Sequence, residues 1–396
     1  MTSKDRLREA RKYRDFAVKE QMTNRISAVL TEAAPMLQVD VERLDSDPYL
    51  LNCPDGTVDL RTGKMREHSA NDFLTKQTAC SPTATPEQAR VWADFLSQIT
   101  CGDDEYTRYL QKICGLFLIG EVKLEKLFVA VGSGGNGKST LFNTLLYVLG
   151  SYGGTISPDV LTITNRNTMP EYAELRGKRL VIAPETDENQ RFDSTAIKRL
   201  SSTDLIRAER KYCAPFSFRP THTLVMFTNT LPKLGAVDAG TWDRIVILPF
   251  TARFRGTTGE KFNLAETLFH SAGGAVLTWM IDGARQVIES GFRIDEPECV
   301  RVATRQYRED SDWLANFVDE RCERGTGYTA GSSELYSEYQ AFSRKHGTVA
   351  ISTTAFRQAV QSAGYTYRHT KTGTKVSGLR VKSTAYQKLV DQNAAG

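Results

Sequence analysis

The spacing of apolar positions changes along the chain and divides it into three parts. Residues 1–45 are highly charged, and their scattered apolar positions predict one or two amphipathic helices that Pro35 interrupts. Short alternating runs around residue 50, with turn residues at 54–56 and 62–63, predict a small β-hairpin. From about residue 86 to 118 apolar residues recur every three or four positions, which predicts helix.

The middle third alternates compact apolar runs with helical patterns. The predicted strands are 126–132, 179–185, 222–229 and 243–250. They are dense in Val, Ile and Leu and apolar on both faces, which a buried parallel sheet requires. The helix-like stretch STLFNTLLYVLG follows the first of them. We therefore predict an α/β core.

After residue 300 the pattern predicts three helices and a hairpin, in the order of a winged helix. The helices cover about 312–324, 332–346 and 352–364, and Ser352 or Thr353 is the expected N-cap of the third. The hairpin covers 365–382 and turns at a Thr-Gly-Thr sequence. Winged helices bind DNA or other proteins, so both interpretations stay open.

Charge is distributed unevenly, although the net charge of the 396 residues is only +4. Nine Lys or Arg and no Asp or Glu lie between Tyr339 and Val390, which leaves 42 basic against 47 acidic residues elsewhere, or −5. A basic C-terminal part on a slightly acidic body indicates an acidic polymer as partner, the alternative being a solvated basic surface. The residues expected to contact DNA there are Arg357, Arg368, Lys371 and Lys375.

Composition narrows the cellular setting. The chain contains no run of eighteen apolar residues, and its charged N-terminus lacks the apolar stretch of a signal peptide. Seven scattered cysteines without a C-x-x-C pair argue against a disulfide framework and a zinc site. We expect a cytoplasmic protein, in a bacterial or archaeal host cytosol, with no membrane partner.

Residues 132–139, GSGGNGKS, match the phosphate-binding pattern G-x-x-x-x-G-K-[ST] between a predicted strand and a predicted helix. Glycines allow the backbone to wrap phosphates, Lys138 is expected to reach the β- and γ-phosphates of ATP, and Ser139 is expected to bind Mg²⁺. The predicted nucleotide contacts are Gly132, Gly134, Gly135, Asn136, Gly137, Lys138, Ser139 and Thr140. No N-K-x-D of the GTPase type follows.

Three further residues complete the predicted catalytic set with Lys138. Glu185 follows the second strand, where a carboxylate can hold Mg²⁺ and polarise the attacking water, with Asp187 or Glu188 assisting. Asn229 follows the third strand and is a candidate sensor of the γ-phosphate. Arg244 lies at the start of the fourth predicted strand: it is a solvated strand end in one subunit, or an arginine finger for a neighbour in a ring.

Between the second and third strands lies a basic segment that contains aromatic residues. Positive charge interleaved with Tyr212, Phe216 and Phe218 suits single-stranded DNA, and the turn near 213–215 predicts a hairpin with a projecting tip. The alternative is that the aromatic residues belong to the core and the charges to the surface. The predicted DNA contacts are Lys198, Arg207, Arg210 and Lys211.

Six motifs in this order resemble the phage and plasmid primase-helicase family, which is related to the poxvirus primase-helicase and grouped in superfamily 3. The motifs are LNCPDGTVDLRTG, VGSGGNGKSTLF, ELRGKRLVIAPETDE, IKRLSSTDLIRAERKY, FSFRPTHTLVMFTNTLP and TWDRIVILPF. The similarity is good over about 45–255 and loose beyond.

The resemblance implies an AAA+-like P-loop ATPase core, a homo-hexameric ring, and 3′-to-5′ movement on single-stranded DNA. The expected domains are a mainly helical oligomerisation region (1–120), the ATPase core (121–295) and a basic winged helix (296–396). In position, Lys138 and Ser139 match the phosphate loop, Glu185 the acidic residue, Asn229 the sensor and Arg244 the finger. Many relatives have two arginines at 243–244 and an N-terminal primase domain, so primer synthesis is not predicted and a separate primase or polymerase is an expected partner.

Three functions fit these features to different degrees. The leading hypothesis is an ATP-dependent helicase for single-stranded or forked DNA of a phage, plasmid or other mobile element. An origin-binding initiator or loader would use the same ATPase to remodel or encircle DNA without unwinding it. A P-loop kinase for small molecules fits less well, because the C-terminal part is basic and no acceptor pocket is evident.

Overall fold

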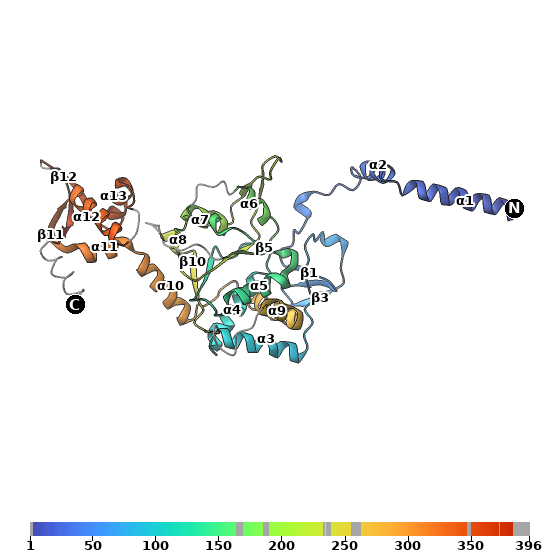
Figure 1. Ribbon diagram of the computed structural model, residues 1–396, viewed down its shortest axis with the longest axis horizontal. Helices are drawn as coiled ribbons and strands as arrows, with labels where there is room; N and C mark the ends of the chain where they lie inside the picture. The colour runs from blue at the N-terminus through green and yellow to red at the C-terminus, as the bar shows by residue number, and fades with distance from the viewer. Residues whose placement is uncertain are drawn as a thin grey trace. The chain divides into compact units, whose positions relative to one another are not determined.

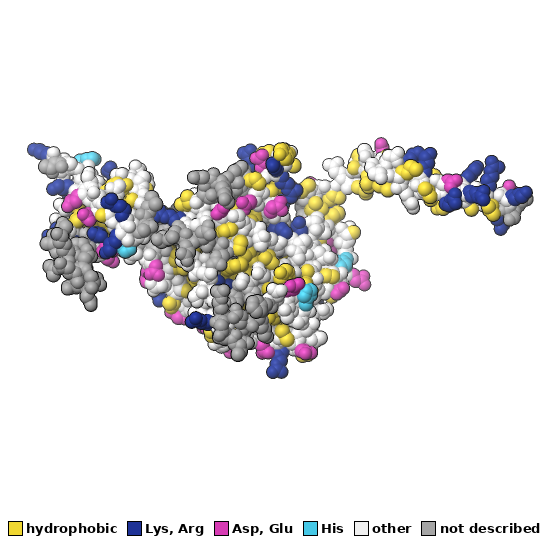
Figure 2. All heavy atoms as spheres, viewed as in Figure 1, with side chains coloured by type: hydrophobic (Ala, Val, Ile, Leu, Met, Phe, Trp, Pro, Cys, Tyr) yellow, Lys and Arg dark blue, Asp and Glu magenta, His cyan; other side chains and the backbone are white. Residues whose placement is uncertain are grey.

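The computed structural model describes residues 3–163, 169–184, 190–232, 234, 239–254, 263–346, 350–371 and 373–382. The chain forms two compact units: Met1–Asp47 with Ser69–Thr75, and Pro48–His68 with Lys76–Gly396. The first unit contains helices α1 (Ser3–Glu20) and α2 (Thr23–Ala33), which confirms that this region is helical; of the one or two helices predicted, two are present, and both end before Pro35. Figure 2 shows basic and apolar side chains exposed side by side along α1.

The second unit is built on a five-stranded sheet with every strand parallel. Its order is β10-β4-β9-β6-β5, with β4 (Leu127–Val131), β5 (Gly153–Thr155), β6 (Leu180–Ala183), β9 (Thr223–Thr228) and β10 (Ile245–Pro249). Each strand pairs in parallel with its neighbours. The four predicted strands are confirmed, and the fifth is the short edge strand β5, which its two glycines concealed.

Both faces of this sheet are buried, because alternate residues of each strand enter different cores. In β4, Phe128 and Ala130 join one core, whereas Leu127 and Val129 join the other. Helices gather on both sides (Figure 1). The first core includes α3 (Pro86–Ile99), α4 (Asp104–Leu116), α5 (Lys138–Leu149) and α9 (Leu264–Glu289). The second includes parts of α6 (Met169–Tyr172), α7 (Ser194–Ser201) and α10 (Glu298–Ser311).

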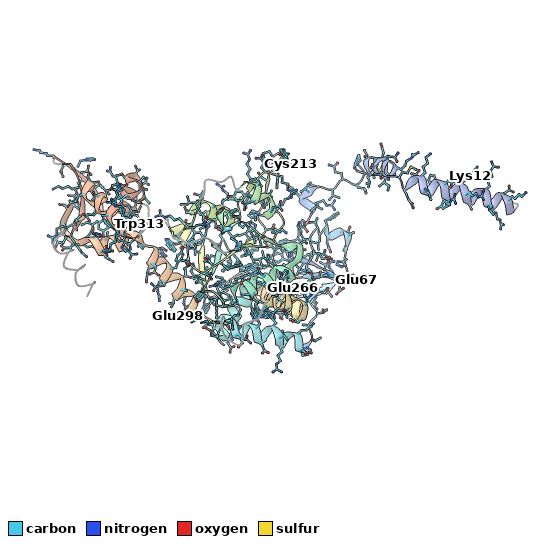
Figure 3. All side chains as sticks on the ribbon, in the orientation of Figure 1. Lys12, Glu67, Cys213, Glu266, Glu298 and Trp313 are labelled. Carbon is cyan, nitrogen blue, oxygen red and sulfur yellow. The ribbon has the colours of Figure 1, made fainter. Side chains whose placement is uncertain are left out.

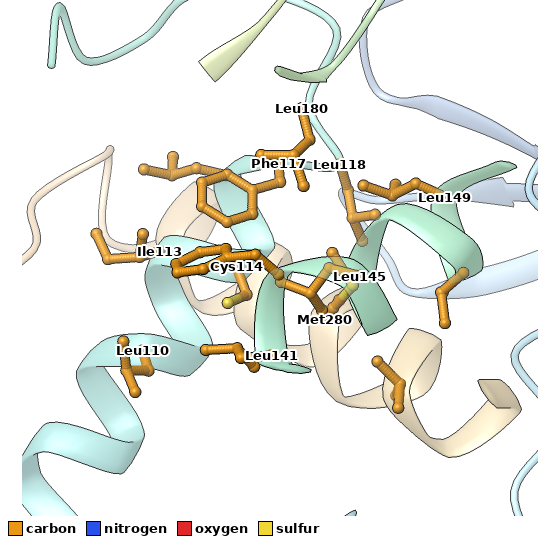
Figure 4. Close-up of a cluster of buried hydrophobic side chains, with 14 of the residues drawn as sticks. Leu110, Ile113, Cys114, Phe117, Leu118, Leu141, Leu145, Leu149, Leu180 and Met280 are labelled. Carbon is orange, nitrogen blue, oxygen red and sulfur yellow. The ribbon is translucent and has the colours of Figure 1, made fainter. Parts of the chain in front are cut away.

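Figure 4 shows how α4, α5 and α9 pack in the first core. Leu110, Ile113 and Phe117 of α4 and its C-cap meet Leu141 and Leu145 of α5. The predicted helix of 86–118 is divided into α3 and α4, because Cys101 and Gly102 adopt positive φ angles of 54° and 76° and end the first helix. The first core therefore extends from residue 51 to residue 300, across the predicted boundary at 120/121.

The predicted hairpin near residue 50 is a three-stranded antiparallel sheet. Its strands are β1 (Leu50–Cys53), β2 (Gly56–Asp59) and β3 (Lys64–Arg66). A second hairpin pairs β7 (Ile206–Ala208) with β8 (Phe216–Phe218), as the turn residues predicted. The four-residue helix α8 (Ala239–Trp242) precedes β10.

The C-terminal part combines three helices with an antiparallel sheet of order β11-β13-β12 around its own apolar core. The helices are α11 (Trp313–Arg321), α12 (Ser332–Lys345) and α13 (Thr353–Ser362), and Ser352 caps the last. The hairpin β12 (Thr366–Thr370) and β13 (Gly373–Val381) is confirmed. One expectation was wrong: the first helix ends at Arg321, and β11 (Cys322–Gly331) takes the place of its last predicted turn because Cys322 pairs with Val381.

Candidate nucleotide and nucleic-acid sites

The glycine-rich loop, residues 132–139, leads from β4 directly into α5. Gly134, Gly135 and Gly137 have φ angles of 92°, 61° and 85°, which residues with a Cβ atom rarely adopt. Gly137 is also crowded, because a Cβ there would lie 2.5 Å from Cγ2 of Ile99. The loop curls around the start of α5, where the first N–H groups of the helix have no partner within the helix and attract anions.

Lys138 is buried at the centre of this loop, with 5% of its surface exposed. Its Nζ donates hydrogen bonds to the carbonyl oxygen of Gly132 (2.6 Å), Oδ1 of Asn136 (2.8 Å) and Oδ1 of Asn229 (3.3 Å). A buried ammonium group requires such acceptors to offset its desolvation. The ammonium is therefore held inside the curve of the loop by oxygen atoms from two different strand ends.

Asn136 fixes the shape of the loop from inside. Its Nδ2 donates to the carbonyl oxygen of Phe250 at the end of β10 (3.0 Å), while its Oδ1 accepts from Lys138. Gly132 has to be glycine here, since a Cβ would lie 2.0 Å from Nδ2 of Asn136. The backbone N–H of Phe254 donates to the carbonyl oxygen of Gly135 (2.8 Å) and braces the far side of the loop.

The parallel sheet brings the predicted sensor to the loop. Val131 is paired with Thr228, so β4 and β9 end side by side and Asn229 follows directly. Asn229 is exposed and its Oδ1 accepts from Lys138, and a Cβ on Gly134 would lie 3.7 Å from that oxygen. The adjacent strand β6 ends at Ala183, two residues before Glu185. Glu185, Asp187 and Glu188 lie outside the described residues.

The start of α5 offers a hydroxyl group for a metal ion. Ser139 is exposed and Thr140 is half-buried in the first turn of the helix. Within the described ranges no group of three or more His, Cys, Asp or Glu could hold a metal. Mg²⁺ at nucleotide sites is usually held by one or two protein groups together with phosphate oxygens and water.

Arg244 and the glycine-rich loop lie at opposite ends of the parallel strands: Arg244 is at the amino end of β10, and the loop is at the carboxyl end of its neighbour β4. It precedes β10, and its carbonyl oxygen accepts from the N–H of Leu127, the first residue of β4. Its Nη2 forms an ion pair with Oε2 of Glu125 (2.5 Å), and its Nη1 donates to the carbonyl oxygen of Gly240 (3.2 Å). Five strand residues lie between it and the level of the loop, and these six steps span about 20 Å at 3.3 Å per residue. That distance exceeds the reach of an arginine side chain.

Two of the residues predicted to contact DNA lie beside Arg244. A pocket of about 600 Å³ is lined by Lys198, Arg199, Ser202, Asp204, Leu205, Arg207 and Arg244. Lys198 and Arg199 come from α7, and Arg207 from β7. We call this the basic pocket, since four of its seven lining residues carry positive charge. The arrangement suits an anion with several negative charges.

The two other predicted contacts, Arg210 and Lys211, lie in the turn between β7 and β8. All residues from 209 to 215 are exposed, and Tyr212 is 93% exposed with a φ of 65°. Figure 3 places Cys213 of this turn at the outer surface. Phe218 is buried at the base of the hairpin. The tip therefore presents two cations and one aromatic ring to solvent, whereas Phe218 belongs to the core.

The C-terminal part has basic side chains on α13 and on the β12–β13 hairpin. Arg368 and Lys375 are exposed and directly opposite each other in the register of the hairpin, and Lys371 is exposed at its turn. Arg357 of α13 stacks over Tyr367 of β12 (4.8 Å). Like charges in opposite positions destabilise a hairpin unless an anion binds them. Arg380 differs, because its Nε donates to Glu323 (3.0 Å).

No described helix is long and apolar enough to cross a bilayer.

Three family models match successive parts of the chain. Residues 2–101 match "D5 N terminal like", residues 130–244 match a family of unknown function, and residues 309–389 match "Poxvirus D5 protein-like". The first and third matches flank the glycine-rich loop, and the second covers it together with Asn229 and Arg244.

Similar curated proteins come from viruses. The "Putative helicase" of Acanthamoeba polyphaga mimivirus is 27% identical over 54% of this chain and 23% of its own length. That of Invertebrate iridescent virus 3 is 27% identical over 70% of this chain and 33% of its own length. The chain thus spans about a quarter to a third of these relatives. Among solved structures, the apo C-terminal region of NrS-1 superposes with a TM-score of 0.47 at 11% identity, over 90% of this chain and 91% of that one.

Proposed function

Because this chain belongs to the primase-helicase family, we propose that it is an ATP-dependent DNA helicase motor of superfamily 3, which serves the replication of a phage, plasmid or other mobile element. The relatives are named as helicases, and this chain spans only part of their length. Its own activity, substrate and partners are therefore argued from its residues.

One observation carries the proposal: Lys138 is held between the glycine-rich loop and Asn229 at the carboxyl ends of two parallel strands. Bound ATP would replace the oxygen atoms around Nζ with phosphate oxygens, and the positive φ glycines leave the loop open to them. Asn229 would then meet the γ-phosphate or the attacking water. This arrangement supports a P-loop in an AAA+-like core.

Ser139 fits Mg²⁺, since its exposed hydroxyl begins the helix that faces the phosphates. Glu185 would be the second protein group near the ion and would orient the attacking water. When bound, Mg²⁺ would neutralise charge that develops on the phosphate oxygens. Both assignments rest on the order of the motifs.

Arg244 supports assembly into a ring. It lies about 20 Å from the loop of its own subunit, so a role on a γ-phosphate requires the loop of a neighbour. In the basic pocket three other cationic residues line the same space as Arg244. We therefore propose a homo-hexamer with nucleotide between subunits, in which Arg244 acts as the arginine finger.

DNA would be held by two surfaces. The exposed tip of the β7–β8 hairpin, with Arg210, Lys211 and Tyr212, suits single-stranded DNA through phosphate contacts and stacking. The C-terminal part, as a winged helix, would bind forked or duplex DNA through α13 and its basic hairpin. We assign oligomerisation to 1–120, ATP hydrolysis to 121–295 and DNA binding to 296–396, in the cytosol of a bacterial or archaeal host.

The test is strand separation of a forked DNA in the presence of ATP and Mg²⁺, compared with a Lys138→Ala variant. Unwinding that requires ATP and Lys138 supports a helicase motor. DNA-stimulated hydrolysis without unwinding would replace it with an initiator or loader that remodels DNA. Hydrolysis or phosphoryl transfer that ignores DNA would overturn the proposal altogether.

A further inference from the structure

The side chain of Arg244 is fixed by the segment that precedes β4. Oε2 of Glu125 accepts from Nη2 at 2.5 Å, and the carbonyl oxygen of Gly240 accepts from Nη1 at 3.2 Å. The backbones are locked together as well, because Leu127 N–H donates to the Arg244 carbonyl oxygen (2.7 Å). The side chain of Lys126 donates to the carbonyl oxygen of Asp243.

These contacts leave the guanidinium oriented and still accessible. The Arg244 side chain is 21% exposed and lines the basic pocket, and its Nε is buried without a hydrogen bond among the described residues. A guanidinium carries five N–H groups, so Nη1 and Nη2 each keep a second N–H beyond the bonds to Gly240 and Glu125. These remaining N–H groups can donate to the oxygens of a phosphate.

Glu125 therefore determines whether Arg244 is ready for a phosphate. An arginine side chain has many rotamers, and the basic pocket is also lined by three other cations and one carboxylate, Lys198, Arg199, Arg207 and Asp204. Repulsion from these cations would turn an untethered guanidinium towards solvent. The carboxylate of Glu125 opposes this repulsion on one side of the guanidinium and leaves the other side to the ligand.

We infer that Glu125 is the positioning residue of Arg244: it holds the guanidinium at the basic pocket so that Arg244 can bind the terminal phosphate of a nucleotide in an adjacent copy of the chain. This inference rests on the proposed function. It adds a carboxylate outside the motifs that carry the family resemblance. Glu125 precedes β4, so it lies at the strand end opposite to the glycine-rich loop of its own subunit.

The first experiment compares DNA-stimulated ATP hydrolysis by Glu125→Ala, Glu125→Gln and Glu121→Ala. Glu121 is the matched control, since it lies in the same segment and pairs with Lys123 (2.8 Å) instead of Arg244. Glu125→Ala should lower kcat about 10- to 100-fold with KM within about 2-fold, because only the transition-state contact is lost. Glu125→Gln keeps an oxygen acceptor but loses the charge, so it should recover only part of the rate, while Glu121→Ala should hydrolyse ATP normally.

The second experiment separates positioning from a structural role. Glu125→Ala subunits keep an intact loop, and Lys138→Ala subunits keep an intact Arg244 with Glu125. Mixing the two should therefore restore hydrolysis at the interfaces where an intact loop faces an intact Arg244. Binding of a fluorescent ATP analogue to Glu125→Ala alone should match the wild type, which a misfolded variant would not achieve.

The outcomes distinguish the inference from the proposed function. If Lys138→Ala and Arg244→Ala abolish hydrolysis while Glu125→Ala keeps the wild-type rate, the inference is overturned and the motor stands. Failure of the mixture to recover at any ratio, with nucleotide binding intact, would also overturn it. If Lys138→Ala itself hydrolyses ATP normally, the proposed function fails first.

Discussion

The facing cations Arg368 and Lys375 allow a prediction with opposite signs for stability and for DNA binding. In opposite positions of an antiparallel pair, Cβ atoms are about 5 Å apart, and two extended side chains place their charges about 7 Å apart. In water that repulsion is about 0.6 kcal/mol, and physiological salt screens it to about 0.2–0.3 kcal/mol. Lys375→Gln should therefore stabilise the C-terminal part slightly and weaken its binding to DNA.

The size of the binding effect follows from counterion release. One phosphate contact contributes about 0.9 to the slope of log affinity against log salt concentration. Between 50 and 200 mM salt a single contact thus accounts for about a threefold change in affinity. The loss caused by Lys375→Gln should be largest at low salt and should shrink about threefold across this range.

The assay is fluorescence anisotropy of a labelled forked DNA at several salt concentrations, with denaturant unfolding of the same proteins. Arg380→Gln is the matched control: it removes a cation from the same strand, but one that is already paired with Glu323, so the salt slope should stay unchanged. An unchanged slope for Lys375→Gln, or an equal change for both variants, would refute the assignment of this hairpin to DNA.

Three further variants test the core and the candidate site. Asn229→Ala should lower kcat of ATP hydrolysis at least about tenfold while equilibrium nucleotide binding changes little, since its amide meets the phosphate end of the site; a change in binding alone would contradict this. Gly115→Ala should lower the unfolding free energy by about 3 kcal/mol, because the added Cβ would lie 2.2 Å from the backbone nitrogen of Ala284. Gly102→Ala should cost only about 1 kcal/mol, since the space there is open and only the φ of 76° is unfavourable. Equal losses in denaturant melts of the two variants would refute the packing argument. Burial lowers the pKa of His222 to about 4 from its usual 6.5, and a hydrogen bond with the Leu200 backbone opposes the shift in part. As pH falls below 6.5 the unfolded chain therefore binds the proton first, and about 3 kcal/mol of stability should be lost by pH 4. Unfolding measured at several pH values should show this loss, and a His222→Leu variant should lack it.

The parallel sheet could be predicted because its strands are apolar on both faces and each ends in a turn or a polar residue. Strand β5 could not, since Gly153 and Gly154 have no side chain to show a pattern. Strand β11 was missed for a related reason: it is glycine-rich, irregular between Arg324 and Thr329, and buries only Cys322 and Ala330 of its ten residues. Both strands form because a neighbouring strand, distant in the sequence, offers hydrogen bonds, and the local sequence does not show this neighbour.

The contacts of the candidate site likewise fall into those that the sequence could predict and those that only the fold reveals. The approach of Lys138 to Asn229 follows from strand order, since parallel strands end at one edge of a sheet. The ion pair of Arg244 with Glu125 joins residues 119 positions apart, and nothing in the sequence around Glu125 distinguishes it from a solvated carboxylate. Likewise Lys198 and Arg207 read as part of a DNA-binding segment, and only the fold places them beside Arg244. Their roles stay predictions.

The close packing of α3 and α4 against the sheet has a consequence for what counts as the smallest autonomous piece of this protein. A fragment that begins at residue 121 keeps every phosphate-loop residue, yet it lacks Ile99, against which Gly137 lies. It also lacks α3 and α4, the helices that cover the apolar side of α9. Such a fragment would expose apolar surface and aggregate, and its loop would lack the wall that shapes it. Division by function and division by folding therefore fall at different positions, and a phosphate site takes its form partly from residues that no phosphate motif contains.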